Sequence, residues 1–529
     1  MTRSQFFFFA GAFVAFAQNP TAEIPVRWHD LASLPIEGKG WSDTKHFYDR
    51  LPARAEGVVR APVWNLSHDS AGMLYRFSTD APLIRARWKL RKPDRLAMPH
   101  MPATGVSGLD LYVLDAGDWR WLANGRPTAG TNEQTLVRDL PRRPREFALY
   151  LPLYNGVESV ELGLPEGFAL QASTRYQGRK PVVFYGTSIL QGGCASRPGM
   201  AYPAIVGRML DWPTINLGFS GNGKTEPEMA DLLSELDPAL YVMDSLPNLS
   251  VQEVSERVEP FVRKLRAKHP DTPIVFAENV NYTDSGMVEA RRSKVAEANA
   301  LLRGIFDNLK KAGAQRIFYV PAWQLYGGDG EDTVDGAHAT DLGFLRMAEG
   351  IAPVIREALA SAGLRVPSEE GFQSAFDGKS LSGWKQRQGK WRAAAGVLSG
   401  SGLILRDQPM RGLLMRFEFM LDAPSEGRVL LHAGQDGPGL EVALDGSIPA
   451  VHPNPEGVRA IRKEGWNSAE VRIEGQPARI RYWLNGRLLT DFQHTEATAK
   501  GAAADGKPGF ASAAGHSLRI RSLRVQSRP

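Results

Sequence analysis

The sequence predicts three folded domains in a row, a three-layer α/β/α domain flanked by two β-sandwich or jelly-roll domains, behind a short apolar leader. Residues 24–172 and 371–527 alternate apolar and polar positions with a period of two, as half-buried strands do. Residues 178–362 instead alternate short apolar runs with helical segments, which indicates a parallel sheet covered by helices. A chain of 529 residues has room for several such domains.

Residues 1–17 are interpreted as a signal peptide. Arg3 supplies the positive charge, Phe6–Phe16 the apolar core, and Ala15-Phe16-Ala17 the small-residue cleavage site. A membrane anchor is the alternative, but the apolar run is short for a bilayer. We expect an exported protein, in the bacterial periplasm or outside the cell, whose mature chain has no stable membrane insertion.

The composition restricts the kinds of partner. Hydrophobic residues make up 43% and charged residues 23% of the chain, as in ordinary folded proteins. The net charge is only +5, and the densest basic cluster, Arg142 to Arg145, is interrupted by Pro144. We therefore expect no nucleic-acid partner. The single cysteine, Cys194, excludes intramolecular disulfides and reads better as a small buried residue than as a nucleophile.

The first β-segment contains one clear amphipathic strand and one hairpin signal. In residues 83–90 one face carries only apolar side chains, those of Ile84, Ala86, Trp88 and Leu90. Asn155-Gly156 separates two strand-like runs, 147–154 and 157–164, and predicts a hairpin. No convincing amphipathic helix is expected in this segment.

The middle segment is predicted to be a parallel sheet with intervening helices. The strand candidates are 181–185, 214–217, 240–243, 274–277 and 316–320. The helix candidates are 254–268, 288–312 and 342–360.

The third segment follows a polar hinge at residues 363–370 and is again β. Alternation is clearest at Met415, Phe417, Phe419 and Leu421. Asn485-Gly486 predicts a hairpin between 479–484 and 487–492, and 518–525 reads as a closing strand.

Ser188 is the candidate nucleophile. The first strand of the middle segment runs into Gly186-Thr187-Ser188, at the carboxyl edge where open α/β sheets place their active sites. Gly186 permits a sharp turn, and the following helix would aim N–H groups at the serine. The alternative is that Ser188 merely caps that helix.

Asp335 and His338 lie on one loop before the last helix, where three-residue spacing lets both side chains point to the same place. A histidine that takes a serine proton and a carboxylate that orients it are the partners Ser188 needs. A surface loop is the alternative. Oxyanion donors are offered by the glycine-rich segment Asn216–Gly223 and by Asn248, each after a strand; no phosphate-binding glycine motif is present there.

These blocks resemble the SGNH/GDSL hydrolase family, with Ser188, Gly221, Asn248, then Asp335 and His338 in the family's order. Thr187 stands where the family has Asp. The resemblance implies a flavodoxin-like domain in which Ser188 attacks an ester, His338 is the base and Asp335 orients it. It also implies an oxyanion hole made by the Ser188 and Gly221 N–H groups and the Asn248 side chain. The nucleophile elbow of α/β-hydrolases does not fit, because Leu190 occupies its last position.

The flanking segments carry resemblances of their own. Gly108–Tyr112, with Met98–Met101 and Phe47–Pro52, resembles the Gly-x-Asp-Leu-Tyr β-domain that precedes some SGNH esterases, where substrate binding and a structural role stay equally open. The third segment resembles the concanavalin-like 3-keto-disaccharide hydrolase domain, on the pieces Phe376–Trp384, Gly439–Val442, Glu464–Asn467 and Leu484–Gly486. Ala443 departs from that domain's motif, which favours a carbohydrate-binding or spacer role.

No metal or other cofactor is expected. Asp329, Glu331 and Asp332 near Asp335 could suggest calcium, but the spacing does not match an EF-hand loop, and a solvated acidic loop is the better interpretation. Export and the sugar-related third segment point to a carbohydrate acetyl ester, hence an acylated glycan as partner. The alternatives are a lipase or general short-chain carboxylesterase, and a non-catalytic glycan-binding protein.

Overall fold

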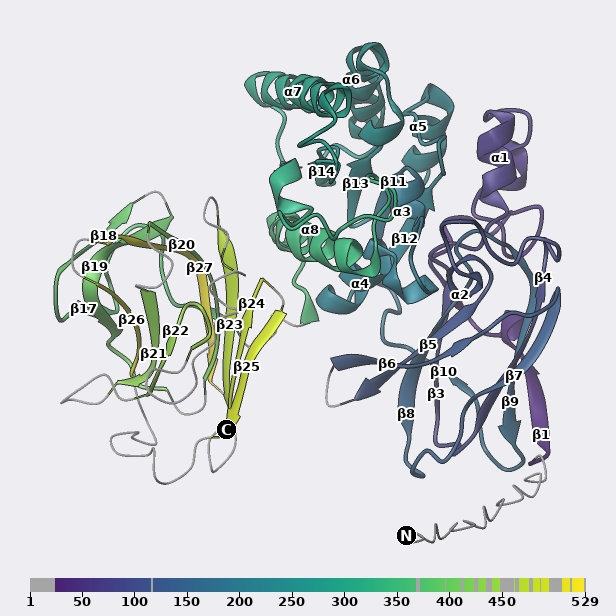
Figure 1. Ribbon diagram of the computed structural model, residues 1–529, viewed down its shortest axis with the longest axis horizontal. Helices are drawn as coiled ribbons and strands as arrows, with labels where there is room; N and C mark the ends of the chain where they lie inside the picture. The colour runs from purple at the N-terminus through teal and green to yellow at the C-terminus, as the bar shows by residue number, and fades with distance from the viewer. Residues whose placement is uncertain are drawn as a thin grey trace, which may run out of the picture. The chain divides into compact units, whose positions relative to one another are not determined.

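A computed structural model (Figure 1) describes residues 24–527 apart from twelve internal residues or short segments. The gaps are 116–117, 368–371, 395, 411–412, 423–426, 434–439, 448–460, 462–465, 475–478, 486, 494–506 and 514–515, and the described part excludes both chain ends. The leader predicted at residues 1–17 lies outside it. The chain forms two compact units, one made of residues 1–178, 187–201 and 214–223 and the other of the remaining residues.

The N-terminal domain is the β-sandwich that the alternation predicts. One sheet has the strand order β1-β9-β4-β7, and the other has the order β10-β3-β8-β5-β6, with β2 beside β3. Their inward side chains form one apolar core, in which Trp88, Phe77 and Phe147 are fully buried. The strands are β1 Val26–Asp30, β2 Ile36–Glu37, β3 Leu74–Thr79, β4 Ile84–Leu90, β5 Leu109–Asp115, β6 Asp118–Gly125, β7 Thr131–Val137, β8 Arg145–Tyr150, β9 Val157–Pro165 and β10 Gln171–Ala172.

The prediction of an amphipathic strand at 83–90 is confirmed by β4, whose four apolar side chains are all buried. The hairpin predicted at Asn155-Gly156 is wrong, because β8 pairs with β3 and β5 while β9 pairs with β1 and β4 in the other sheet. Asn155 is instead fully buried, and its side chain bonds the backbone of Lys92 in both directions, at 2.9 Å each. Its amide thus joins two loops rather than shaping a tight turn.

Two short helices in this domain were not expected from the sequence. They are α1, Ala61–Ser67, with Pro62 in its first turn, and α2, Ala103–Val106. At seven and four residues both are too short to display a helical period in the sequence.

The predicted parallel sheet is present in the middle domain. In the second unit β11, Val182–Gly186, pairs with β13, Leu240–Asp244, which is followed by β14, Ile274–Ala277, and β15, Ile317–Val320. Every residue of β11, β13 and β14 is buried, as expected for strands covered on both faces. The fifth predicted strand, β12, Thr214–Gly218, belongs to the first unit.

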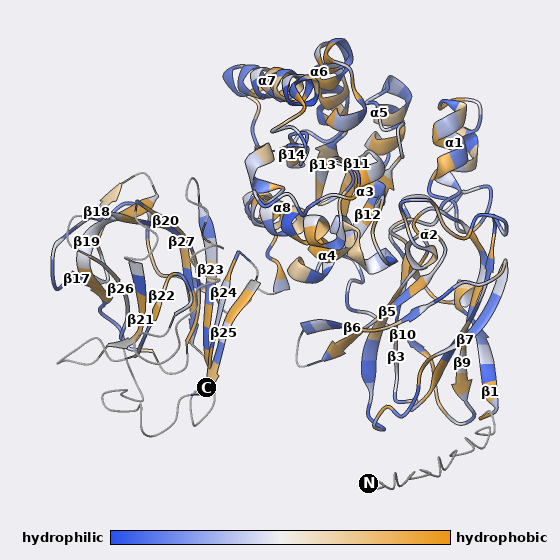
Figure 2. Ribbon diagram, in the orientation of Figure 1, coloured by the Kyte–Doolittle hydropathy of each residue, from blue (hydrophilic) through white to orange (hydrophobic). Residues whose placement is uncertain are grey.

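The helices of the middle domain pack in two groups, α4 with α8 and α5 with α6 and α7, which provide the two outer layers. Figure 2 shows the strands of the middle domain as mainly hydrophobic and α7 as mainly hydrophilic. The stripe predicted in α6, from Val254 to Leu265, is buried, and a capping box at Ser250 and Glu253 starts that helix. The helices are α3 Ser188–Gln191, α4 Tyr202–Leu210, α5 Pro227–Ser234, α6 Val251–Lys268, α7 Glu289–Lys311 and α8 Asp341–Ser361.

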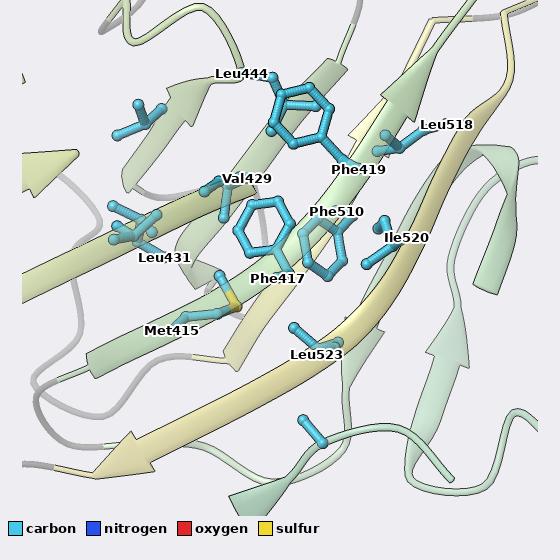
Figure 3. Packing of buried hydrophobic residues seen from close by; sticks show 14 of the residues in the cluster. Met415, Phe417, Phe419, Val429, Leu431, Leu444, Phe510, Leu518, Ile520 and Leu523 are labelled. Atoms are coloured by element: carbon cyan, nitrogen blue, oxygen red, sulfur yellow. The ribbon is translucent and has the colours of Figure 1, made fainter. Parts of the chain in front are cut away.

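The C-terminal domain is a β-structure with the strand order β22-β21-β26-β19-β27-β20-β23-β24-β25 and with β16, β17 and β18 attached. Phe417, Phe419 and Phe510 meet in its core (Figure 3), and the predicted hairpin is formed by β24 and β25. The strands are β16 Gln373–Ser374, β17 Trp384–Gln386, β18 Lys390–Ala394, β19 Val397–Arg406, β20 Leu413–Leu421, β21 Gly427–Ala433, β22 Leu440–Ala443, β23 Asn467–Glu474, β24 Arg479–Leu484, β25 Arg487–Gln493, β26 Lys507–Ser512 and β27 Leu518–Ser527.

None of the helices in the described part of the chain combines the length and the apolar character needed to cross a bilayer.

Candidate active site

Ser188 is the first residue of α3 and is only 8% exposed. The cap position belongs to Thr187, whose side chain makes no capping hydrogen bond, so the interpretation of Ser188 as a helix cap does not hold. The Ser188 carbonyl accepts hydrogen bonds from the N–H groups of Gly192 and Gly193, at 3.1 and 2.8 Å, and from the Tyr154 hydroxyl at 3.1 Å. These contacts fix the backbone from which the Ser188 side chain projects.

The Gly221 loop is attached to the same short helix. Gly221 has a φ of +68°, a left-handed conformation that glycine adopts without strain. Its neighbour Ser220 donates its N–H to Oε1 of Gln191, the last residue of α3, at 3.0 Å. Gly218 at the end of β12 lies so close that a Cβ there would stand 2.3 Å from the Gln191 nitrogen. The first unit thus brings the Ser188 helix and the Gly221 loop together.

Asn248 ends the short 3-10 helix Leu246–Asn248, which begins two residues after β13. The last residue of β13, Asp244, is in register with Gly186, the last residue of β11. Asn248 and Ser188 therefore follow neighbouring strands at the same edge of a parallel sheet, four and two residues beyond the strand ends.

Asp335 and His338 form a direct pair. Asp335 Oδ2 lies 2.7 Å from His338 Nδ1. The other oxygen, Oδ1, accepts the backbone N–H groups of His338 and Ala337, at 2.8 and 3.1 Å. Both side chains are partly exposed, His338 by 28% and Asp335 by 43%.

The charge state of Asp335 follows from these contacts. Burial alone would raise the pKa of its carboxyl, but the hydrogen bonds from the His338 backbone and ring and from Ala337 lower that pKa to about 2. An ionised carboxylate can only accept hydrogen bonds, so Nδ1 of the neutral His338 ring carries the proton. The other ring nitrogen, Nε2, is then the one that can accept a proton.

The loop that carries this pair is held from several sides. Thr333 and Ala339 form an isolated antiparallel bridge across it. The Tyr326 hydroxyl donates to the Ala337 carbonyl at 3.0 Å, and the Thr283 N–H donates to the Gly336 carbonyl at 3.1 Å. Gly336 itself has a φ of +88°. The pair therefore stands on a fixed backbone.

Two of the acidic residues before Asp335 form ion pairs with a single arginine. Arg346 on α8 contacts Asp329 and Asp332, at 2.7 and 2.9 Å, and the hydrogen bond from Arg346 lowers the pKa of Asp329 to about 2. In the described residues, no group of three or more His, Cys, Asp or Glu side chains is arranged to hold a metal ion.

A buried aspartate beside the strand ends was not singled out from the sequence. Asp244 is 3% exposed and accepts a hydrogen bond from the Tyr202 hydroxyl at 2.7 Å. Burial raises the pKa of its carboxyl to about 7, although the Tyr202 hydrogen bond acts in the opposite direction. No local motif marks this residue, because its partner is 42 residues away in the sequence.

The aspartate of the Gly-x-Asp-Leu-Tyr motif anchors the chain that follows α3. Asp110 is fully buried, and its Oδ2 accepts the N–H of Gly199 and a guanidinium N–H of Arg197, at 2.8 and 2.9 Å. Of the two roles left open for this β-domain, these contacts support the structural one.

The C-terminal motif is described only in part. Asp445, which follows the departure at Ala443, is 8% exposed and accepts the Ser447 N–H at 2.8 Å, a local turn contact. Gly439, Glu464, Gly465 and Gly486 lie outside the described residues.

Comparisons with known families match all three domains. Residues 179–356 match the GDSL-like lipase/acylhydrolase family, residues 26–170 the N-terminal domain of SGNH-hydrolase-type esterases, and residues 371–526 the 3-keto-alpha-glucoside-1,2-lyase-like domain. Comparison with curated proteins gave no match.

Two solved structures each match more than half of this chain. A Bacteroides ovatus protein described as a GDSL-like lipase is 34% identical, with a TM-score of 0.60, over 63% of this chain and 98% of its own. The salicylyl-acyltransferase SsfX3 of a tetracycline biosynthetic pathway is 21% identical, with a TM-score of 0.52, over 64% of this chain and 98% of its own, and shares the fold. The predicted α/β fold with flanking β-domains is confirmed, and the chain belongs to the GDSL-like (SGNH) lipase/acylhydrolase family.

Proposed function

We propose that this chain is an exported serine esterase in which Ser188, His338 and Asp335 form a catalytic triad. The observation that carries the proposal is the Asp335–His338 pair, with its 2.7 Å contact and a carboxylate whose other oxygen is held by two backbone N–H groups. This is the arrangement by which a carboxylate fixes the tautomer and orientation of a catalytic histidine. Family membership supports hydrolysis of a carboxylic ester.

In the proposed reaction, Nε2 of His338 takes the Ser188 hydroxyl proton as Oγ attacks the ester carbonyl. The N–H groups of Ser188 and Gly221 and the Asn248 amide stabilise the negative charge that develops on the carbonyl oxygen. The protonated histidine then gives its proton to the departing alcohol. A water molecule, activated by the same histidine, releases the acid from Ser188.

We further propose that the substrate is an acetyl ester on a glycan. The C-terminal domain supports this choice, because the family it matches is named for action on a keto-glucoside. A non-catalytic glycan-binding function is less well supported, since it leaves the Asp335–His338 pair without a role. A lipase or general short-chain carboxylesterase is the remaining candidate; the inserts near the catalytic blocks are short or polar, unlike an apolar lid.

Export to the periplasm or the extracellular space forms part of the proposal, on the strength of the apolar leader at residues 1–17. It would bring the enzyme to polymeric glycans outside the cytoplasm. Comparing the N-terminal sequence of the protein in cell fractions tests it, with Gln18 expected at the start of the exported form.

A substrate panel tests the specificity. Purified protein is assayed with aryl acetate, butyrate and octanoate esters and with acetylated and deacetylated polysaccharides, with Ser188→Ala as control. We expect acetate to be preferred and acetic acid to be released from the acetylated polymers. Faster turnover of the octanoate would favour the lipase. Binding to the polymers with no ester hydrolysis at all would favour the glycan-binding function.

A further inference from the structure

A buried guanidinium supports the strand end and loop that lead to Gly221. Arg50, 1% exposed, donates to the carbonyl oxygens of Gly218 at 2.6 Å and Asp69 at 2.9 Å, and it lies 4.8 Å from the centre of the Phe219 ring. Burial lowers the pKa of Arg50 to about 10, although the Asp69 charge acts to raise it. The N-terminal β-domain is thereby bonded to the strand end that leads into the Gly221 loop.

A second chain of contacts runs through Asp69 and Gln191. Asp69, 1% exposed, accepts Nζ of Lys92 at 2.6 Å on one oxygen and Nε2 of Gln191 at 3.1 Å on the other. Gln191 is fully buried, and its Nε2 also donates to the Leu153 carbonyl at 3.0 Å. With both amide protons used, the Oε1 of Gln191 must face the Ser220 N–H, which it accepts at 3.0 Å.

We propose that Asp69 and Gln191 are positioning residues for the oxyanion hole. They act through the hydrogen bond from the Ser220 N–H to Gln191, which fixes the backbone directly before the Gly221 N–H. The inference rests on the proposed function, because it assigns the Gly221 N–H to the oxyanion. Asp69 fixes which end of the Gln191 amide faces the loop. Gln191, on the same helix as Ser188, then fixes the distance between nucleophile and donor.

Positioning of the oxyanion donor should affect the transition state more than the binding of the substrate. The donors of an oxyanion hole act on the charge that develops during reaction, and removing one costs about 10²–10³ in kcat. A variant that keeps the Gly221 N–H but loses the hydrogen bond between Ser220 and Gln191 should lose less of its kcat. We expect Gln191→Met, which keeps the size of the side chain and removes every hydrogen bond, to lower kcat about 10- to 100-fold. KM for an aryl acetate should change less than about threefold.

The polarity of the Asp69–Gln191 contact gives a sharper test. Gln191→Glu places two carboxylates together, and Asp69→Asn turns an amide toward an amide. The double variant restores one donor and one acceptor between positions 69 and 191, keeps a single negative charge and leaves an oxygen for the Ser220 N–H, while the Leu153 carbonyl loses its donor. We expect each single variant to lose kcat and the double variant to regain at least about tenfold over Gln191→Glu. A purely structural role would show in melting temperature and not in this recovery.

The matched control is Arg76→Met. Arg76 is also buried in the N-terminal domain, at 5% exposure, but its side chain pairs with Glu37 and lies over Trp119 and Tyr176. We expect it to lower the melting temperature without changing kcat.

The assays measure kcat, KM and inhibition by phenylboronic acid, which forms a tetrahedral anion on a catalytic serine. Weaker inhibition in step with the lower kcat supports the inference. A folded Gln191→Met variant with the kcat of the control would overturn it. Turnover by Ser188→Ala would instead overturn the proposed function, so the two failures are distinguishable.

Discussion

Asp335 is bound to His338 through both of its carboxylate oxygens, one at the ring and one at the backbone N–H. The same carboxylate therefore orients both the His338 ring and the loop backbone that carries it. Replacing the carboxylate by an amide would change the tautomer that the ring adopts.

We predict that Asp335→Asn lowers kcat by a large factor, about 10⁴ as for carboxylate loss in another triad, and that His338→Ala is at least as damaging. Both variants should remain folded, because the two side chains are partly exposed. Initial rates with an aryl acetate, alongside circular dichroism, measure both effects. Near-normal rates in a folded His338→Ala protein would contradict the triad.

The pH profile of the wild type offers a second prediction. The base must be neutral, so kcat/KM should rise with pH through one ionisation in the histidine range, about 5 to 8. Asp335, with a pKa of about 2, stays ionised there and adds no second step. A flat profile across that range would show that no histidine acts as the base.

Chelators should leave the activity unchanged. The proposed reaction uses no metal, and Asp329 and Asp332 already share the positive charge of Arg346. Rates after dialysis against EDTA, with and without added calcium or zinc, test this. Loss of activity that one divalent ion restores would mean that the acidic loop binds that ion.

Among single residues, the sequence could indicate the proposed catalytic residues but not the buried residues that position them. Ser188, Asp335 and His338 stand in local patterns of a few residues. Arg50 reaches Gly218 across 168 positions, and Gln191 reaches Asp69 across 122. No local spacing or periodicity reports such contacts, although Arg50 lay within a segment that resembled the β-domain.

At the scale of elements, the local hydrophobic pattern and the length of a segment decided which strands and helices could be predicted. The five strands of the middle domain were predicted because each is a short apolar run, and its three long helices because they show a helical period. The Asn155-Gly156 hairpin was wrong, since sheet membership depends on partners far along the chain. The same signal at Asn485 was right, because β24 and β25 do pair and Asn485 has a φ of +50°.

The end of β13 has a testable electrostatic property. The pKa of Asp244 is raised to about 7, so the folded protein binds a proton that the unfolded chain releases at about pH 4. This contribution to stability is complete below pH 4 and is lost as the pH rises to about 7. Relative to Asp244→Asn, the wild type should lose on the order of 2–4 kcal/mol of unfolding free energy over that interval. Denaturant unfolding at pH 4, 5.5 and 7 measures the difference; parallel curves would contradict it.

At the scale of the whole molecule, all the proposed catalytic residues lie between Ser188 and His338, whereas the third domain match begins at residue 371. We predict that deleting residues 371–529 leaves hydrolysis of a small acetyl ester intact and weakens action on an acetylated polymer. A bound domain would raise the effective concentration of the polymer near the site. A matched control is full-length protein on the same small ester.

Two results would revise that modular interpretation. Loss of small-ester hydrolysis by a folded truncated protein would mean that the third domain completes the active site. Full activity on every polymer tested would remove the glycan-binding role. The departure at Ala443 also leads us to expect no cleavage of 3-keto-disaccharides by the full chain.

The central claim is that Ser188 is the nucleophile, and covalent labelling tests it most directly. The protein is treated with a fluorophosphonate, and the modified peptide is identified by mass spectrometry in wild type, Ser188→Ala and His338→Ala. We predict a single adduct on Ser188, formed in proportion to the loss of esterase activity, slowed in His338→Ala and absent from Ser188→Ala. An adduct on another residue, together with normal turnover by a folded Ser188→Ala protein, would contradict the claim.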